Sequence, residues 1–276
     1  MTLDKYSYRY LALEIFMIVL ALFIVFPFFF IIINTLKTNS EVLLNPLALP
    51  SSVSFDNYAE AFRKMNFWTS FKNTSLITLI SVSLMVLMGS MAAYPVSRFG
   101  SRWTSLVLVY FLIGFMVPLQ TTMVPLFVTI RNIGLNDSIY GVMLIYAANC
   151  IFSFFLYTGF MKTVPRELEE AGMIDGCNPW QIFWKIVFPL LKPVTVTIII
   201  LETMWVWNDF TFAYLFLHSK DKITLVLEIY KGVGEFSNDW PIMLSTMVIV
   251  ILPAAIFYLV LQRQIISGLT SGALKG

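Results

Sequence analysis

The residues best suited to chemistry gather in one stretch, 165–193, which is polar and acidic although 58% of the chain is hydrophobic. Three carboxylates, Glu167, Glu169 and Glu170, stand almost together there. The chain's one histidine, His218, cannot form a metal site alone, and its two cysteines have no metal-ligand spacing. We therefore expect these carboxylates to recognise a partner outside the membrane rather than to catalyse a reaction, and we expect no metal site.

The stretch contains the start and stop residues of two short helices that meet at a sharp corner. Pro165 suits the first turn of a helix, where its missing N–H has no partner anyway, and the glutamates after it favour the positive end of a helix dipole. Asp175-Gly176 predicts the end of this helix, because glycine adopts the left-handed conformation at low cost. Asn178-Pro179 then predicts a new start, as N-cap and first residue.

The second predicted helix carries one apolar stripe. Its members follow i, i+3, i+4, i+7 and i+8 spacing and are Trp180, Phe183, Trp184, Val187 and Phe188. Pro189 and Pro193 are expected to end it. Two interpretations remain open: a helix–turn–helix element that docks into a groove of a soluble partner, or an amphipathic helix that packs on its own bundle at the membrane surface.

The elements that hold this stretch are predicted to lie in a membrane. Charged residues make up 12% of the chain and the mean hydropathy is +0.80, whereas soluble domains carry about 25% charged residues. The formal net charge of +2 comes without a basic patch. We therefore expect membrane lipid around the chain and no nucleic-acid partner.

Six segments reach or approach the length of about 20 apolar residues that a helix needs to cross a bilayer. They are Leu11–Ile33, Thr74–Val96, Thr104–Leu126, Ile139–Met161, Val194–Leu217 and Pro241–Leu261. Pro118 and Pro125 interrupt the third, which predicts either a kink packed against its neighbours or a break that lines a path. Because backbone groups in lipid must be satisfied internally, the expected fold class is all-α: a polytopic membrane protein with six transmembrane helices and a cytoplasmic helix–turn–helix loop.

Positive charge gathers on one side of the predicted bundle. Since spans alternate in direction, Arg98 and Arg102 after the second span lie on the same side as the stretch 165–193 and both termini. The side richer in lysine and arginine is usually cytoplasmic. We therefore expect a multi-pass protein of the cell membrane with both termini in the cytoplasm.

Several motifs, taken together, resemble one known family. Glu170-Ala171-Gly172 with Gly176, and then Ile186, Pro189 and Pro193, resemble the cytoplasmic "EAA" loop of ABC importer permeases. Further motifs are similar to the second permease of the maltose-type, carbohydrate branch: Ala93-Tyr94, Ser97-Arg98, Trp207-Asn208-Asp209-Phe210, Gln262-Arg263 and the run 268–276. Gly172 departs from the family pattern, which has alanine there. This departure predicts a first helix that is looser by up to about 1 kcal/mol.

The resemblance implies partners rather than an activity of the chain's own. They are a second homologous permease, a dimer of ATPase subunits, an extracytoplasmic solute-binding protein and a carbohydrate substrate. No G-x-x-x-x-G-K-[ST] motif occurs in the sequence, so we expect no enzyme and no cofactor in this chain, with ATP and magnesium bound by the ATPase. Closure of that ATPase would move the loop and, through it, the spans.

The resemblance also implies site residues and domains. Contact with the ATPase is implied for Glu167, Glu169, Glu170, Ala171, Gly172, Asp175, Gly176, Phe183 and Pro189 in the loop, and for Gly272, Lys275 and Gly276 in the C-terminal tail. The implied domains are an N-terminal span with an outside loop (1–70), a permease transmembrane domain (71–263) that includes the loop 165–193, and a cytoplasmic tail (264–276).

Candidates for the substrate path lie in the fifth predicted span: Trp205, Trp207, Asn208 and Asp209. Polar groups at membrane depth often mark a path, and aromatic rings beside them suit the C–H faces and hydroxyls of a sugar. Asn208 and Asp209 are equally suited to bonds between helices. The expected substrate is a sugar or oligosaccharide, with glycerol phosphate or a polyol as the alternative. The near absence of basic residues in the spans favours the neutral sugar.

Two other classes of function are weighed against the permease. A membrane-embedded enzyme needs catalytic side chains that face each other, and the sequence shows no such constellation. A channel passes its solute without an ATPase, so flux into vesicles without ATP would identify it.

Overall fold

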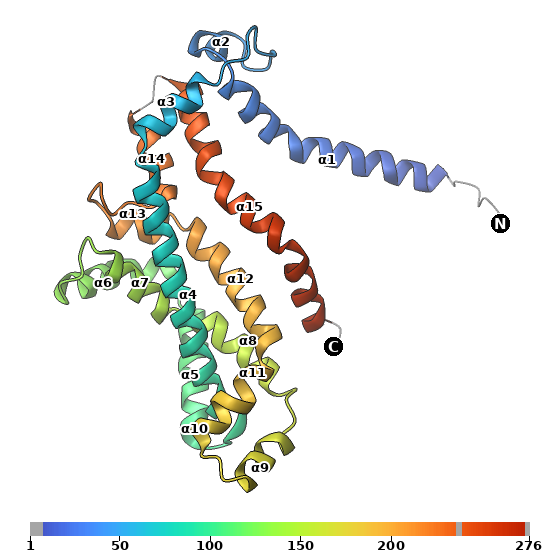
Figure 1. Cartoon of the computed structure of the whole chain (residues 1–276), viewed down its shortest axis with the longest axis vertical. Coiled ribbons are helices and arrows are strands. Elements are labelled where there is room, and N and C mark those ends of the chain that lie inside the picture. The colour runs from blue at the N-terminus through green and yellow to red at the C-terminus, as the bar shows by residue number, and fades with distance from the viewer. Residues whose placement is uncertain (1–7, 236–238, 274–276) are drawn as a thin grey trace. The chain divides into compact units, whose positions relative to one another are not determined.

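A computed structural model of the chain describes residues 8–235 and 239–273, and within them every regular element is a helix (Figure 1). The predicted all-α fold class is therefore confirmed. The helices divide into two compact units. One contains the described residues up to Asn66 together with Glu228–Leu252, and the other contains Phe67–Leu227 and the described residues from Pro253 onward. The division into domains expected from the sequence, at 70/71 and 263/264, stays a prediction.

In the first unit, helix α1 (Tyr8–Thr35) is apolar around its circumference, and its side chains are exposed from residue 10 to residue 29. A helix with this pattern requires apolar surroundings such as lipid. Just after its end, the buried Lys37 ammonium donates to the Asn34 side chain at 3.1 Å and to the carbonyls of Asn45 and Pro46. Helices α2 (Asn39–Leu44) and α3 (Asp56–Lys64) follow.

Among the residues that the structure describes, four helices are long and apolar enough to cross a membrane: Tyr10–Thr35, Phe67–Arg98, Ile139–Met161 and Trp240–Gln262. Two further pairs of helices pass the same test but are bent, and counting each pair as one span gives six. The predicted number of six spans therefore holds only with two of them broken.

The third predicted span, Thr104–Leu126, is broken at Pro118, one of the two prolines predicted to interrupt it, whereas Pro125 lies within a helix. The chain forms α5 (Arg102–Met116) and α6 (Leu119–Asn132), and its direction bends by 105° between them. Between them Val117 has an extended backbone, because a residue before proline is pushed out of the helical region and Pro118 follows. Pro118 also lacks the N–H that the Gly114 carbonyl would receive in a continuous helix.

The fifth predicted span, Val194–Leu217, extends too far. Helix α12 (Lys192–Asn208) ends before Asp209, which has an extended backbone, and a separate short helix, α13 (Thr211–Phe216), follows. The helical run that forms a bent pair with α12 is instead the preceding one, Pro179–Leu190, and the bend between the two is 74°.

The core of the second unit forms around α4 (Phe67–Arg98), which packs on α7 (Ile139–Ala148), α8 (Ile151–Met161) and α12. Gly89 permits the close approach to α8, since a Cβ there would lie 2.7 Å from the Cβ of Ser153. Met85, Phe154 and Tyr157 fill the interface and are fully buried. Helices α14 (Leu225–Glu235) and α15 (Trp240–Ala273) each contribute residues to both units.

Candidate functional site

The acidic loop, residues 165–193, begins with the predicted corner. Helix α9 (Glu167–Ile174) starts just after Pro165 and is followed by Gly176, whose φ of +83° is the left-handed conformation that glycine favours. Asn178 then caps helix α10 (Pro179–Ile182) by a reciprocal pair of bonds with Gln181, at 2.9 and 3.0 Å. The helix end at Asp175-Gly176 and the restart at Asn178-Pro179 are confirmed.

The second helix of the loop ends at Leu190, between the two prolines that were predicted to end it, but it passes through Pro189 before it does so. α10 continues through a π turn, η1 (Phe183–Val187), into α11 (Phe188–Leu190), and the Phe188 N–H bonds to the Phe183 carbonyl five residues back. In a regular helix the ring of Pro189 would clash with the Lys185 carbonyl, which would also lose its donor. The wider π turn lets the helix continue through the proline.

The predicted apolar stripe is present, although its burial is graded. Phe183 and Val187 are buried, Trp184 and Phe188 are half-buried, and Trp180 is 60% exposed. Its rings contact one another: the centroid of Trp184 lies 6.1 Å from that of Trp180, 4.9 Å from that of Phe183 and 5.1 Å from that of Phe188.

A buried cluster of three side chains, which we call the Glu169 cluster (Tyr94, Arg98 and Glu169), fastens α9 to the end of α4. The Glu169 carboxylate forms an ion pair with the Arg98 guanidinium, and both side chains are less than 8% exposed. The Tyr94 hydroxyl donates to the other carboxylate oxygen at 2.9 Å. Arg98 also donates to the Val164 carbonyl at 3.1 Å. These bonds fix α9 to the C-terminal end of α4.

The outward side of the acidic loop is a mixed acidic and apolar surface. Of the loop residues expected to contact an ATPase, the exposed ones are Glu167, Glu170, Ala171, Asp175, Gly176 and Pro189. Beside them Leu168, Met173, Ile174 and Trp180 are also exposed, with Ile174 at 87%. Both helices lie at one end of the second unit (Figure 1). Such a surface suits a protein partner rather than lipid alone.

Two residues of the predicted set, Glu169 and Phe183, point into the chain instead. Phe183 is 2% exposed, and its ring lies 5.3 Å from that of Tyr94, measured between centroids. Neither side chain is positioned to touch a partner directly. Both instead hold the loop against α4, so any role in coupling is one of positioning.

Gly172 is buried where the two helices of the loop cross. A Cβ there would lie 2.5 Å from Cδ1 of Ile186, the mobile end of a half-buried side chain. The departure from alanine at this position therefore goes together with a close crossing of α9 against the η1 turn, which offsets the lower helix propensity of glycine.

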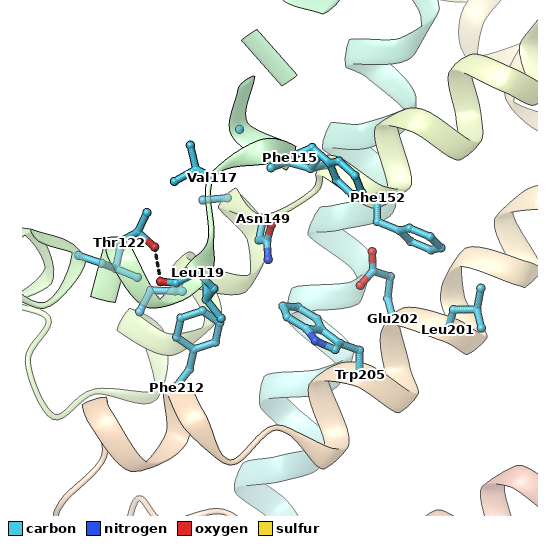
Figure 2. A pocket seen from close by; sticks show the side chains of 15 residues that line it. Phe115, Val117, Leu119, Thr122, Asn149, Phe152, Leu201, Glu202, Trp205 and Phe212 are labelled. Atoms are coloured by element: carbon cyan, nitrogen blue, oxygen red, sulfur yellow. Dashed lines mark hydrogen bonds between the residues drawn. The ribbon is translucent and has the colours of Figure 1, made fainter. Parts of the chain in front are cut away.

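A second candidate site is a cavity of about 770 Å³ within the second unit, next to the break between α5 and α6 (Figure 2). It is lined mainly by apolar side chains from α5, α6, α7, α8, α12 and α13. Its polar lining groups are Thr122, Asn149, Glu202 and the indole of Trp205. Breaks in transmembrane helices are tolerated where they line a cavity, as this one does.

The four predicted path residues have different environments. Trp205 lines the cavity, whereas Trp207 packs edge-on against Phe71 at 5.9 Å. Asn208 donates to the Met204 carbonyl of its own helix at 2.7 Å. Asp209 accepts from the Tyr146 hydroxyl at 2.9 Å and from the Phe212 N–H at 2.8 Å, so it caps α13 and joins two helices.

Three polar residues of the cavity, Thr122, Asn149 and Glu202, are not among the site residues that the sequence predicts. Glu202 lies one helical turn before Trp205 on α12, so the i, i+3 spacing was a usable signal. Asn149 lies between α7 and α8 and gave no signal, because the sequence predicts Ile139–Met161 as one uninterrupted span.

Outside the predicted spans, Asp137 joins two loops of the second unit. Its carboxylate accepts from the Ser219 hydroxyl, from the backbone N–H groups of His218 and Ser219, and from Lys222. Burial alone would raise the pKa of Asp137, but these hydrogen bonds outweigh it and hold the pKa well below its ordinary value. The implied tail contacts Lys275 and Gly276 lie outside the described residues, and Gly272 belongs to α15.

Comparison with known proteins gives a consistent picture. The family model of the binding-protein-dependent transport system inner membrane component matches residues 85–270. The probable starch degradation products transport system permease protein AmyC of Thermoanaerobacterium thermosulfurigenes is 33% identical, with 94% of each chain covered. The melibiose/raffinose/stachyose import permease protein MelC of Bacillus subtilis (strain 168) is 35% identical, with 91% of each chain covered.

The fold has a counterpart among solved structures. A chain of a bacterial ABC transporter involved in the import of the acidic polysaccharide alginate superposes with a TM-score of 0.82 and 24% identity. The match covers 95% of the present chain and 99% of the other.

Proposed function

The chain belongs to the family of inner membrane components of binding-protein-dependent transport systems, and from this premise we propose that it is the permease subunit of an ATP-driven importer of a sugar or oligosaccharide. The observation that carries the proposal is the family match over residues 85–270, which includes both the acidic loop and the cavity. Family members of this kind are transport subunits and not enzymes.

The outward side of the acidic loop is the proposed docking surface for a separate ATPase subunit that binds ATP and magnesium. Its exposed carboxylates and apolar side chains support this role, and the Glu169 cluster supplies the connection to α4. Movement of a docked ATPase would be passed to the spans through that cluster. A second homologous permease and an extracytoplasmic solute-binding protein complete the proposed complex. On this proposal the loop and both termini lie in the cytoplasm.

A sugar is favoured over glycerol phosphate or a polyol for two reasons. The relatives named above are described by their names as permeases for starch products and for melibiose, raffinose and stachyose. In addition, the residues that line the cavity include one carboxyl group and no lysine or arginine to balance a phosphate. An anionic substrate would therefore meet a carboxyl group without a compensating base.

The experiment that tests this function is uptake by the reconstituted complex. The chain, its second permease, the ATPase and the binding protein would be assembled in proteoliposomes and supplied with radiolabelled maltotriose, raffinose or glycerol 3-phosphate. We expect uptake of a neutral oligosaccharide that requires both ATP hydrolysis and the binding protein. Uptake of glycerol 3-phosphate alone would support the alternative, and equal flux without ATP would identify a channel.

The docking surface has its own test. Glu170→Arg reverses a charge on the outward side of the loop, and we expect at least a tenfold loss of ATP-dependent uptake with normal insertion of the permease. Lys162→Glu reverses an exposed charge just outside the loop and is the matched control. Equal uptake by both variants would contradict docking at this surface.

A further inference from the structure

We infer that the cavity beside Glu202 is a binding site for a neutral sugar within this chain. The Glu202 carboxyl and the Asn149 carboxamide would serve as its hydrogen-bonding groups, with Trp205 as its stacking surface. The inference rests on the proposed function and goes beyond it, because it assigns direct contacts with the transported sugar to this subunit rather than to its partner permease alone.

The first observation is the incomplete hydrogen bonding of Glu202. Its side chain is buried within α12, with the residue 4% exposed, and one carboxyl oxygen accepts from the Ser153 hydroxyl at 3.2 Å. No other hydrogen bond to this carboxyl group occurs in the described part of the chain. A buried carboxyl group at membrane depth is costly unless its oxygens are bonded. The group lines the cavity, so a ligand there can supply the missing donor.

The second observation is the carboxamide of Asn149. The backbone N–H of this residue is used by the carbonyls of Ile145 and Tyr146, whereas its side chain makes no hydrogen bond to any described residue. Figure 2 shows the carboxamide and the Glu202 carboxyl around the same space, the first from the turn between α7 and α8 and the second from α12. One group that accepts and one that both donates and accepts match the alternating hydroxyls of a sugar ring.

The third observation is the support behind Trp205, which is 37% exposed and lines the same space. The Tyr146 ring meets it edge-on, with centroids 5.5 Å apart. Tyr146 is held in turn by its hydroxyl bond to Asp209, which also caps α13. Asp209, predicted from the sequence as a path residue, is thus a positioning residue for the indole. A fixed aromatic face suits the C–H surface of a sugar.

The chemistry of the lining selects among possible occupants. A volume of about 770 Å³ is within the range of small-molecule sites, about 300–1,000 Å³. A lipid acyl chain would match the apolar walls but would leave the Asn149 carboxamide and one Glu202 carboxyl oxygen without hydrogen bonds. A uronate or a phosphate would need a basic residue, and none lines the cavity. A neutral sugar satisfies the polar groups and the aromatic surface together.

The first test is transport by the complete reconstituted complex, with raffinose and maltotriose as probes. Relative to wild type, we expect Glu202→Ala and Asn149→Ala to lower ATP-dependent uptake at least tenfold, and Glu202→Gln to lower it less because the amide keeps an acceptor. Ile199→Ala lies on the same helix, outside the cavity lining, and should stay within twofold. ATPase activity stimulated by the binding protein should persist in every variant, which shows that the complex is assembled.

The second test does not depend on transport. In a Cys150→Ser, Cys177→Ser background, Ala148→Cys, which lines the cavity without being one of its proposed binding groups, would be labelled with a polar thiol reagent, with and without raffinose or maltotriose. We expect the transported sugar to slow labelling at least fivefold, and to have no effect at Leu144→Cys, an exposed position of α7 that does not line the cavity. This test remains decisive if Glu202→Ala fails to assemble.

The outcomes separate the inference from the proposed function. A wild-type complex that imports neither sugar contradicts the proposed function. A wild-type complex that imports one, with unchanged uptake by Glu202→Ala and Asn149→Ala or with unprotected labelling, overturns the inference alone. Quenching of Trp205 fluorescence by lipids brominated in the acyl chain, absent in Trp205→Phe and unaffected by the sugar, would assign the cavity to lipid and also overturn it.

Discussion

Two glutamates of the second unit are buried to almost the same degree, Glu169 at 5% exposed and Glu202 at 4%, but their surroundings differ in kind. Glu169 has a buried arginine and a tyrosine hydroxyl as partners, from a different helix. Glu202 has one serine hydroxyl and faces a cavity. The difference teaches that burial alone does not assign a role to a carboxyl group. A buried carboxyl group whose partners are all supplied by the chain holds helices together, whereas one that lacks a partner is available to a ligand.

The contrast between the two glutamates is tested most directly at the ion pair of Glu169 with Arg98. Glu169→Ala leaves the Arg98 guanidinium buried without its partner, and removing one member of a buried pair costs about 3–5 kcal/mol of unfolding free energy. We expect a large fall in the midpoint of thermal unfolding of the purified complex, together with loss of the ATPase on size exclusion. Glu170→Ala, its exposed neighbour, should change the stability by less than about 0.5 kcal/mol. Equal midpoints for the two variants would show that the ion pair does not hold the loop.

The corner of the loop gives the next largest effect. Gly176→Val forces a branched residue into a left-handed conformation, which costs about 1–2 kcal/mol. Limited proteolysis should cut the variant near residue 176 faster than the wild type. Gly159→Ala is the matched control, because this helical glycine has open space around its Cβ position and should gain up to about 1 kcal/mol. Protection of residue 176 in the valine variant would argue against a fixed corner.

The cavity side of the comparison predicts a smaller effect on stability. Glu202→Gln keeps an oxygen that accepts from Ser153 and removes an acidic group that is costly to bury, so we expect a change of less than about 1 kcal/mol. The measurement is the same thermal midpoint. A fall in the midpoint as large as that of Glu169→Ala would mean that Glu202 also holds helices together, and the contrast between the two carboxyl groups would disappear.

The smallest effect concerns Asp137, a carboxylate in a loop. Its pKa is lowered in the folded chain, so the stabilisation it provides is fully present above its ordinary pKa and is lost as the pH falls through the lowered value. We expect protection of the amides of His218 and Ser219 from hydrogen exchange to be constant from neutral pH to about 4, and to decline only in stronger acid. Asp137→Asn should show weaker protection at neutral pH and no such decline. A change centred near pH 6 would implicate another group.

Local signals in the sequence were sufficient where a structural feature depends on neighbouring residues. The left-handed Gly176 and the cap formed by Asn178, Pro179 and Gln181 were predictable because each acts within one turn of helix. The six apolar segments were predictable for the same reason, since hydropathy is a property of consecutive residues. The bends were harder: Pro118 indicated an interruption, but the angle of 105° depends on how α5 and α6 pack.

The site could not be predicted where it depends on residues distant in the chain. Glu167, Glu169 and Glu170 are similar in sequence, and only the position of Arg98 and Tyr94 on another helix selects Glu169 as the inward one. The π turn was missed because Pro189 normally signals a helix end. Asn149 and Glu202 are ordinary residues of two separate spans, and the cavity that they share exists only in the packed structure.

The break between α5 and α6 has a consequence for hydration. Pro118 has no N–H to offer the Gly114 carbonyl, and the last carbonyls of any helix lack partners in their own helix. At the depth of a bilayer lipid tails cannot satisfy such groups, but Gly114, Phe115 and Val117 all line the cavity. Water that enters the cavity can bond to them. A sugar arriving there would then exchange one polar environment for another, instead of shedding its whole hydration shell at a single step.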